Sequence, residues 1–146
     1  MRITLDYTPH LKQALFHYLS TRDDIYYILL SWGVRSGKST AGVYQITLEM
    51  LRSSAGIIVG PDDYTCDSLW EKVNKHLKDL ISYKVKQKKV IELINGHRIE
   101  FKVADDPDKI ISKGYEYAIL DEGGKMEAQV WWNLTQRWQL EKKLRI

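Results

Sequence analysis

The sequence predicts one α/β domain over residues 1–146, with a mainly parallel sheet flanked by helices and a β-hairpin inserted into it. Short apolar runs typical of buried strands alternate with segments of helical periodicity, and both motifs that carry chemistry follow such a run. In sheets of this kind, ligands bind at the carboxyl ends of the strands. The expected strands are residues 25–31, 55–60 and 115–120, and the expected helices are residues 9–21, 38–52, 62–80 and 127–140.

Composition excludes several classes of protein. The hydrophobic content of 44% and charged content of 28% are ordinary for a globular domain, and no apolar run is long enough to cross a bilayer. The first ten residues lack the apolar stretch of a signal peptide, and Cys66 has no second cysteine with which to form a disulfide. These features favour a reducing compartment and no membrane. A net charge of +3 permits contact with a polyanion without requiring it.

The first expected helix has a clear start. Thr8 supplies an N-cap hydroxyl and Pro9 fits the first helical position. Gln13 lies off the apolar side of this helix and is therefore expected to be exposed. The apolar side, which we expect to face the core, consists of Leu11, Ala14, Leu15, Tyr18 and Leu19.

The third and last expected helices also have a clear apolar side. Asp62 or Asp63 is expected to cap the third helix, and Val130, Trp131, Leu134 and Trp138 lie on one side of the last. The core positions expected in the third helix are Leu69, Val73, Leu77 and Leu80.

Between the third helix and the last strand, the pattern changes to that of a hairpin. A three-residue loop at Asn95–His97 would pair Leu93 with Ile99, and it would set Glu92 opposite Glu100. A basic ribbon precedes this loop. It has the composition to follow a DNA backbone, but lysines at a sheet edge also prevent aggregation, and the sequence alone favours that interpretation. The ribbon consists of Lys84, Lys86, Lys88 and Lys89.

The stretch Trp32-Gly33-Val34-Arg35-Ser36-Gly37-Lys38-Ser39-Thr40 has the pattern of a phosphate-binding loop. A glycine turn that leads into a helix supplies converging backbone N–H groups and the favourable end of the helix dipole. Lys38 would reach the β- and γ-phosphates and Ser39 would bind Mg²⁺. The full pattern has glycine at position 32, where this chain has Trp32, but residues 34–39 make most of the cradle. The alternative is a chance turn at a helix N-terminus.

Asp121 and Glu122 follow an apolar run that ends at Leu120. Two carboxylates at the end of a buried strand are costly unless a cation or a reaction uses them. Beside a phosphate loop, Asp121 would hold Mg²⁺ and Glu122 would act as general base toward the attacking water. Considered alone, the pair is more simply an exposed strand end that starts a loop.

Three basic residues are weaker candidates. Arg35 lies inside the loop, where it could contact a γ-phosphate or a neighbouring subunit, or remain solvated. Lys125 and Arg137 could stabilise developing charge, but exposed helix positions explain both more simply.

Taken together, these residues resemble the ATPase domain of the large terminase subunit, the DNA-packaging motor of tailed bacteriophages. Tyr7 to His10 with Gln13 is similar to the adenine-binding glutamine motif of that family. Gly33 to Ser39 resembles its arginine-containing phosphate loop, and Tyr117 to Glu122 its Walker B strand. The hairpin at 95–99, the stretch 113–115 and the helix at 131–137 also resemble family segments.

The resemblance implies a P-loop NTPase fold of the RecA or ASCE type that hydrolyses ATP with Mg²⁺ and couples hydrolysis to translocation of double-stranded DNA. It implies a homo-oligomeric ring with an arginine acting in trans, docked on the portal protein of a procapsid in the bacterial cytoplasm and working with a small terminase subunit. By the resemblance, Gln13 reads adenine, Arg35 and Lys38 contact phosphates, Ser39 and Asp121 bind metal, and Glu122 activates water.

Three departures from the family pattern stand out. Trp32 replaces the first glycine of the loop, and Gly123-Gly124 follows the acidic pair. The coupling motif and nuclease domain of the family have no counterpart before Ile146, so we expect a fragment or a reduced relative. Two other functions stay open, a helicase-like ATPase and a nucleotide-binding assembly module without turnover.

Overall fold

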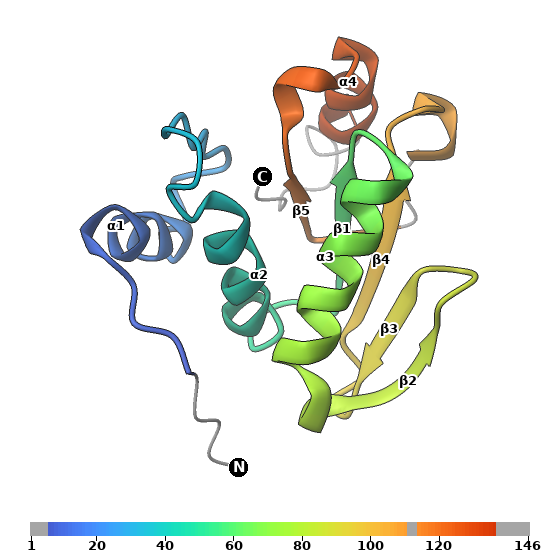
Figure 1. Cartoon of the computed structure of the whole chain (residues 1–146), viewed down its shortest axis with the longest axis horizontal. Helices are drawn as coiled ribbons and strands as arrows, with labels where there is room; N and C mark the ends of the chain where they lie inside the picture. The colour runs from blue at the N-terminus through green and yellow to red at the C-terminus, as the bar shows by residue number, and fades with distance from the viewer. Residues whose placement is uncertain (1–5, 111–113, 137–146) are drawn as a thin grey trace.

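A computed structural model describes residues 6–110 and 114–136 (Figure 1). The α-helices are α1 (Leu11–Ser20), α2 (Lys38–Glu49), α3 (Asp63–His76) and α4 (Ala128–Gln136). The strands are β1 (Ala55–Gly60), β2 (Ile81–Val85), β3 (Val90–Leu93), β4 (Arg98–Val103) and β5 (Tyr117–Leu120). Short 3₁₀ turns are η1 (Lys78–Leu80), η2 (Pro107–Ile110) and η3 (Gly123–Lys125). None of the described helices is long and apolar enough to span a membrane.

The described strands form one sheet in the order β2-β3-β4-β1-β5. β1 pairs in parallel with β4 and β5, whereas β3 pairs antiparallel with β2 and β4. The sheet is therefore mixed, and the prediction of a mainly parallel sheet was wrong on this point. The hairpins supply as many antiparallel pairs as the crossover connections supply parallel ones.

The β3–β4 hairpin has a different register from the predicted one. Ile91 pairs with Ile99 and Glu92 with Arg98, and the loop is Ile94–Gly96. Gly96 takes the left-handed conformation, with φ +81°, that this loop requires. The shift of two residues keeps the same side chains on the core face, and it sets Glu92 opposite a cation instead of Glu100.

Helices cover both faces of the sheet, so the apolar runs are buried on both sides (Figure 1). On one face, Ile58 and Phe101 pack with residues of α2 and α3 such as Ile46 and Leu69. On the other face, Ile57 packs with residues around α4. Asp62 caps α3 as predicted, through a 2.7 Å bond from the Thr65 N–H, and the predicted core residues Leu69, Val73, Leu77 and Leu80 are buried.

The last helix agrees only in part with its predicted apolar side. Val130 and Leu134 are buried, but Trp131 is 40% exposed. Trp138 lies outside the described residues.

The predicted strand at residues 25–31 is absent. The chain there has no regular secondary structure, and Leu29 is 90% exposed. A strand needs a neighbour for its backbone groups. β5 is the last strand in the sheet order and has no described strand on its outer side, and a cavity separates it from this segment. The apolar composition predicted a buried strand, and both parts of that prediction were wrong, because no described strand pairs with residues 25–31 and none of them is buried.

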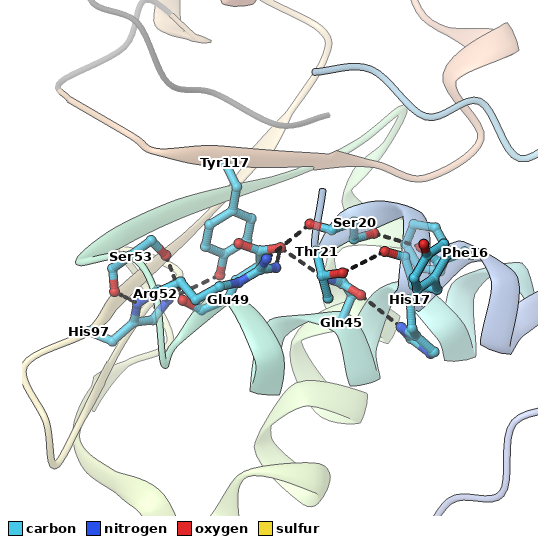
Figure 2. A network of polar contacts seen from close by, with 11 residues as sticks. Phe16, His17, Ser20, Thr21, Gln45, Glu49, Arg52, Ser53, His97 and Tyr117 are labelled. Carbon is cyan, nitrogen blue, oxygen red and sulfur yellow. Dashed lines mark hydrogen bonds and ion pairs between the residues drawn. The ribbon is translucent and has the colours of Figure 1, made fainter. Parts of the chain in front are cut away.

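The first helix was predicted with the wrong start and the wrong buried face. α1 begins at Leu11, and its N-cap is His10 instead of Thr8. The predicted core residues Leu11 and Tyr18 are 86% and 60% exposed, whereas Gln13 is only 5% exposed. The helix packs on α2 with its polar side, because the partners it meets there are polar (Figure 2).

Candidate nucleotide-binding site

The loop before α2 has the geometry of an anion-binding turn. Gly37 is the N-cap of α2 and has φ +81°, a conformation that favours glycine. A Cβ at this position would lie 2.6 Å from Nε2 of Gln13, so a larger residue would also displace the Gln13 amide. The N-terminal N–H groups of α2 and the positive end of its dipole point out of the loop toward any bound anion.

Lys38 is folded back onto this loop. Its Nζ donates hydrogen bonds to the carbonyl oxygens of Trp32, at 2.8 Å, and Gly33, at 2.9 Å. The ammonium group is thereby held over the loop, where an anion seated on the backbone N–H groups would meet it. Within the described part of the chain the ammonium meets only these carbonyl oxygens, so a phosphate oxygen can replace them at little cost.

Ser39 and Asp121 contact each other, although they are 82 residues apart in the chain. The Ser39 hydroxyl lies 2.8 Å and 3.0 Å from the two carboxylate oxygens of Asp121. Asp121 directly follows β5, and its N–H donates to the carbonyl of Val59, which fixes the direction in which β5 ends. The parallel β1–β5 pair therefore delivers the carboxylate to the first turn of α2.

Glu122 has a strained backbone and an ion-pair partner. Its φ of +55° is unusual for a residue with a side chain, and its carboxylate lies 2.6 Å from Nζ of Lys125. The hydrogen bond that Lys125 donates to this carboxylate raises the pKa of Lys125. The Glu122 side chain is half-exposed, so the pair is open to solvent.

Lys38, Ser39, Asp121 and Glu122 line one cavity of about 870 Å³. Its walls are the segment 27–32, the first turns of α2, the end of β5 and the start of α4, whereas residues 33–37 of the loop do not line it. Away from these four residues the lining is mostly apolar, which is typical of a ligand site with a few convergent polar groups.

The other predicted loop residues are placed less centrally. Arg35 has φ +59° and is exposed, as are Gly33, Thr40 and Val34, the last at 93%. The Ser36 hydroxyl oxygen is shielded from solvent and has no hydrogen-bond partner among the described residues. A buried polar atom without a partner is costly, and here it borders the predicted phosphate cradle.

Gln13 reaches the loop, contrary to the expectation that it is exposed. Its Nε2 donates to the Gly37 carbonyl at 3.1 Å, and its Oε1 accepts the N–H of His10 at 3.1 Å. The side-chain amide therefore ties α1 to the loop. Its position off the apolar side of the helix was correct, and the inference of exposure was wrong because the polar side of α1 is the packed one.

Sequence reasoning missed the contacts of His10 with the loop. Its Nδ1 accepts the Gln13 N–H, at 3.4 Å, and its Nε2 lies 3.0 Å from the Ser36 carbonyl. The spacing of His10 and Gln13 matches that of an N-cap residue and its N3 partner, a signal that was present in the sequence.

Polar contacts also attach the rest of α1 to α2 (Figure 2). Nδ1 of His17 donates to Oε1 of Gln45 at 2.7 Å, and Gln45 donates to the buried carboxylate of Glu49 at 2.7 Å. Arg52 bridges this carboxylate to the Ser20 carbonyl at the end of α1. Only Gln13 and Ser20 of α1 are fully buried, so these hydrogen bonds largely determine where the helix lies.

The basic ribbon mostly faces α3. Lys86 lies 3.3 Å from Glu71, Lys89 lies 2.9 Å from Asp63, and Lys84 donates to an amide oxygen of α3. β2 is an edge strand of the described sheet. These contacts favour edge protection over DNA contact as the role of the ribbon.

No group of three His, Cys, Asp or Glu side chains arranged to hold a metal occurs in residues 6–110 and 114–136. Mg²⁺ does not need one, since it is usually bound by one or two protein oxygens together with water and phosphate oxygens. The hydroxyl of Ser39 and the carboxylate of Asp121 are oxygen ligands on adjacent elements and fit that requirement.

The fold and the arrangement of the loop with an acidic strand end define a P-loop-like α/β domain. Neither a family model nor a curated protein sequence matches the chain. Among solved structures, the chain is similar to the ATPase domain of the large terminase of Thermus phage P74-26. An arginine-to-alanine variant of that domain gives a TM-score of 0.74 and the unsubstituted domain 0.70, both at 22% identity over 97% of this chain.

The large terminase of the thermophilic bacteriophage D6E is also similar, with a TM-score of 0.69 and 15% identity over 94% of this chain. The fold is therefore that of large terminase ATPase domains. The chain spans 65% of the Thermus phage domain and 38% of the D6E protein.

Proposed function

We propose that this chain is an ATP-binding and ATP-hydrolysing module of a viral DNA-packaging motor, with one P-loop domain of the RecA or ASCE type over residues 1–146. The observation that carries the proposal is the contact between Ser39 and Asp121, which joins the loop to the acidic strand end beside Lys38. The similarity to terminase ATPase domains supports the same class of function.

Each residue has a role that its position supports. Backbone N–H groups at 34–39 bind the phosphates, and Lys38 exchanges its two carbonyl partners for phosphate oxygens. Ser39 and Asp121 would hold Mg²⁺, which neutralises phosphate charge when bound. Arg35, exposed on the loop, is free to turn toward a γ-phosphate or a neighbouring subunit. The resemblance assigns Gln13 to adenine, and to contact it the buried amide would exchange its present bonds to His10 and Gly37.

Glu122 would accept a proton from the attacking water. Its carboxylate lies at the rim of the same cavity, one residue from Asp121. To act as a base it must release Lys125, an exchange that costs little because both side chains are half or more exposed.

The assignments of partners extend the proposal to the whole motor. They comprise double-stranded DNA, a portal protein, a small terminase subunit and further copies of this chain in a ring at a procapsid in the bacterial cytoplasm. They rest on the similarity of fold, because the described residues show no base-reading element.

Titration with a fluorescent ATP analogue tests the binding site. Lys38→Ala removes a charged hydrogen bond to phosphate and is expected to weaken binding about ten- to hundredfold. Omitting Mg²⁺ should weaken binding to the wild type. Lys12→Ala removes an equal charge from an exposed position on α1 and should leave affinity unchanged. Equal affinity of wild type and Lys38→Ala would overturn the assignment of the loop.

One observation favours the alternative of a binding module without turnover. The 2.6 Å pair between Glu122 and Lys125 occupies the proposed base. Phosphate release by the wild type that disappears in Glu122→Gln, with nucleotide affinity unchanged, would exclude this alternative. Binding without phosphate release in either protein would establish it.

A further inference from the structure

We propose that Trp32 and His10 form a clamp that fixes the phosphate loop to α1, so that Trp32 raises nucleotide affinity instead of impairing the loop. The inference rests on the proposed function and concerns a departure from the phosphate-loop pattern, which has glycine at this position. Both residues are positioning residues, since they act through the loop backbone.

The clamp consists of two contacts. The His10 and Trp32 ring centroids lie 5.7 Å apart at an interplanar angle of 55°, within the range of favourable aromatic pairs. Nε2 of His10 also lies 3.0 Å from the carbonyl of Ser36. The clamp therefore touches both ends of the loop.

The hydrogen-bond partners of His10 determine the tautomer of its neutral ring. Nδ1 accepts the backbone N–H of Gln13, so in the neutral ring Nε2 carries the hydrogen. This N–H can then donate to the carbonyl of Ser36, which only accepts. A single imidazole thus caps α1 with one nitrogen and holds the loop with the other.

The clamp matters because few contacts join this end of α1 to the loop, although Tyr7, just before the helix, stacks on Tyr44 of α2. Leu11 and Leu15 face solvent at 86% and 54% exposure, so hydrophobic burial contributes little to the position of the helix. The polar network around Gln45 holds the opposite end (Figure 2). Among the described residues, the other contact between α1 and the loop is the amide of Gln13 on Gly37. Loss of the clamp would release both the loop and Gln13.

Substitution of Trp32 distinguishes the clamp from the phosphate-loop pattern, because the two predict opposite changes in nucleotide affinity. Trp32→Gly restores the usual pattern, and the pattern alone predicts equal or tighter binding. The clamp predicts that Kd for the ATP analogue rises roughly five- to tenfold, as expected for an aromatic pair plus added loop freedom. Trp32→Phe keeps a ring and should recover most of the affinity. Val34→Gly is the matched control, since it adds the same flexibility at a side chain 93% exposed.

His10→Asn tests the other half of the clamp without removing the helix cap. Asparagine is a good N-cap but is too short to hold the Ser36 carbonyl as well. We expect a rise in Kd similar to that of Trp32→Gly, and no further rise in the double variant, because the two residues act as one unit. Amide exchange in the free proteins should quicken at residues 11–14 and 36–39 in both variants.

The outcomes are distinct. Trp32→Gly binding as tightly as wild type, or losing no more than Val34→Gly, overturns the clamp. So does additive loss in the double variant. If wild type and Lys38→Ala bind equally, the proposed function fails and the affinity role of the clamp fails with it. In that case unchanged amide exchange in Trp32→Gly would also remove the clamp as a structural feature.

Discussion

The sheet and α1 are held in place by different forces. β1, β4 and β5 lie between helices on both faces, and their side chains form two apolar clusters. α1 turns its apolar side to solvent and meets α2 through hydrogen bonds (Figure 2). The comparison teaches that periodicity identifies a helix, while the neighbouring element decides which of its faces is buried.

The candidate site lies between these two regions. The contact between Ser39 and Asp121 belongs to the packed region, because α2 and β5 carry it. Gln13 and His10 belong to α1, whose attachment is polar. We therefore expect the side of the site that we propose for Mg²⁺ to be rigid, and the side that we propose for adenine to adjust more easily.

The largest expected effect comes from truncating the same residue type in both regions. Leu69→Ala on α3 removes a side chain 3% exposed and should reduce the free energy of unfolding by about 2–5 kcal/mol. Leu15→Ala on α1, at 54% exposure, should change it by less than about 0.5 kcal/mol. Urea unfolding followed by circular dichroism measures both. Equal losses would show that α1 buries its apolar side after all.

A smaller effect is expected from the ion pair that ends the polar network. Glu49 is buried, and its carboxylate lies 2.7 Å from Arg52, whose side chain is 30% exposed. Arg52→Met leaves that carboxylate with only the amide of Gln45 and should cost about 2–4 kcal/mol, less than for a wholly buried pair.

Arg22→Met breaks the exposed pair with Asp24 and serves as the control for Arg52→Met. It should leave stability unchanged in the same urea titration. If Arg52→Met also left the free energy of unfolding unchanged, the polar network around Glu49 would not hold α1 in place.

The sequence predicted correctly those features that depend on residues close together in the chain. The boundaries of β1 and the cap of α3 depend on local patterns, and both were correct. The strand expected at 25–31 was wrong because pairing needs a neighbour, which composition cannot reveal. The hairpin register was wrong by two residues because both registers bury the same face.

The site was likewise predictable where it depends on local spacing and not where it depends on the packing of α1. Spacing identified Lys38, Ser39 and Asp121 as candidates, and the fold brings them to one cavity. It could not reveal that Trp32 contacts His10, because that contact depends on where α1 lies. The position of α1 in turn depends on polar partners that a hydrophobic pattern does not record.

The smallest expected effect is a pH dependence from the packed region. His97 is 1% exposed; Nδ1 donates to the Ser53 carbonyl and Nε2 accepts from the Tyr117 hydroxyl. Burial lowers the pKa of His97, and it outweighs the opposing effects of the Ser53 carbonyl, Glu116 and Glu49. The unfolded chain, with a histidine pKa near about 6.5, therefore binds the proton first as pH falls.

Stability should accordingly be constant above about pH 7.5 and decline below about pH 6.5, by at most about 1.4 kcal/mol per pH unit for this group. His97→Gln can keep a donor toward Ser53 but cannot be protonated, so its free energy of unfolding should decline less over the same interval. His76, whose pKa burial also lowers, leaves a residual dependence in both proteins. Parallel pH profiles for wild type and His97→Gln in urea titrations would show that His97 is as easily protonated folded as unfolded, and that the packed region tolerates a charge there.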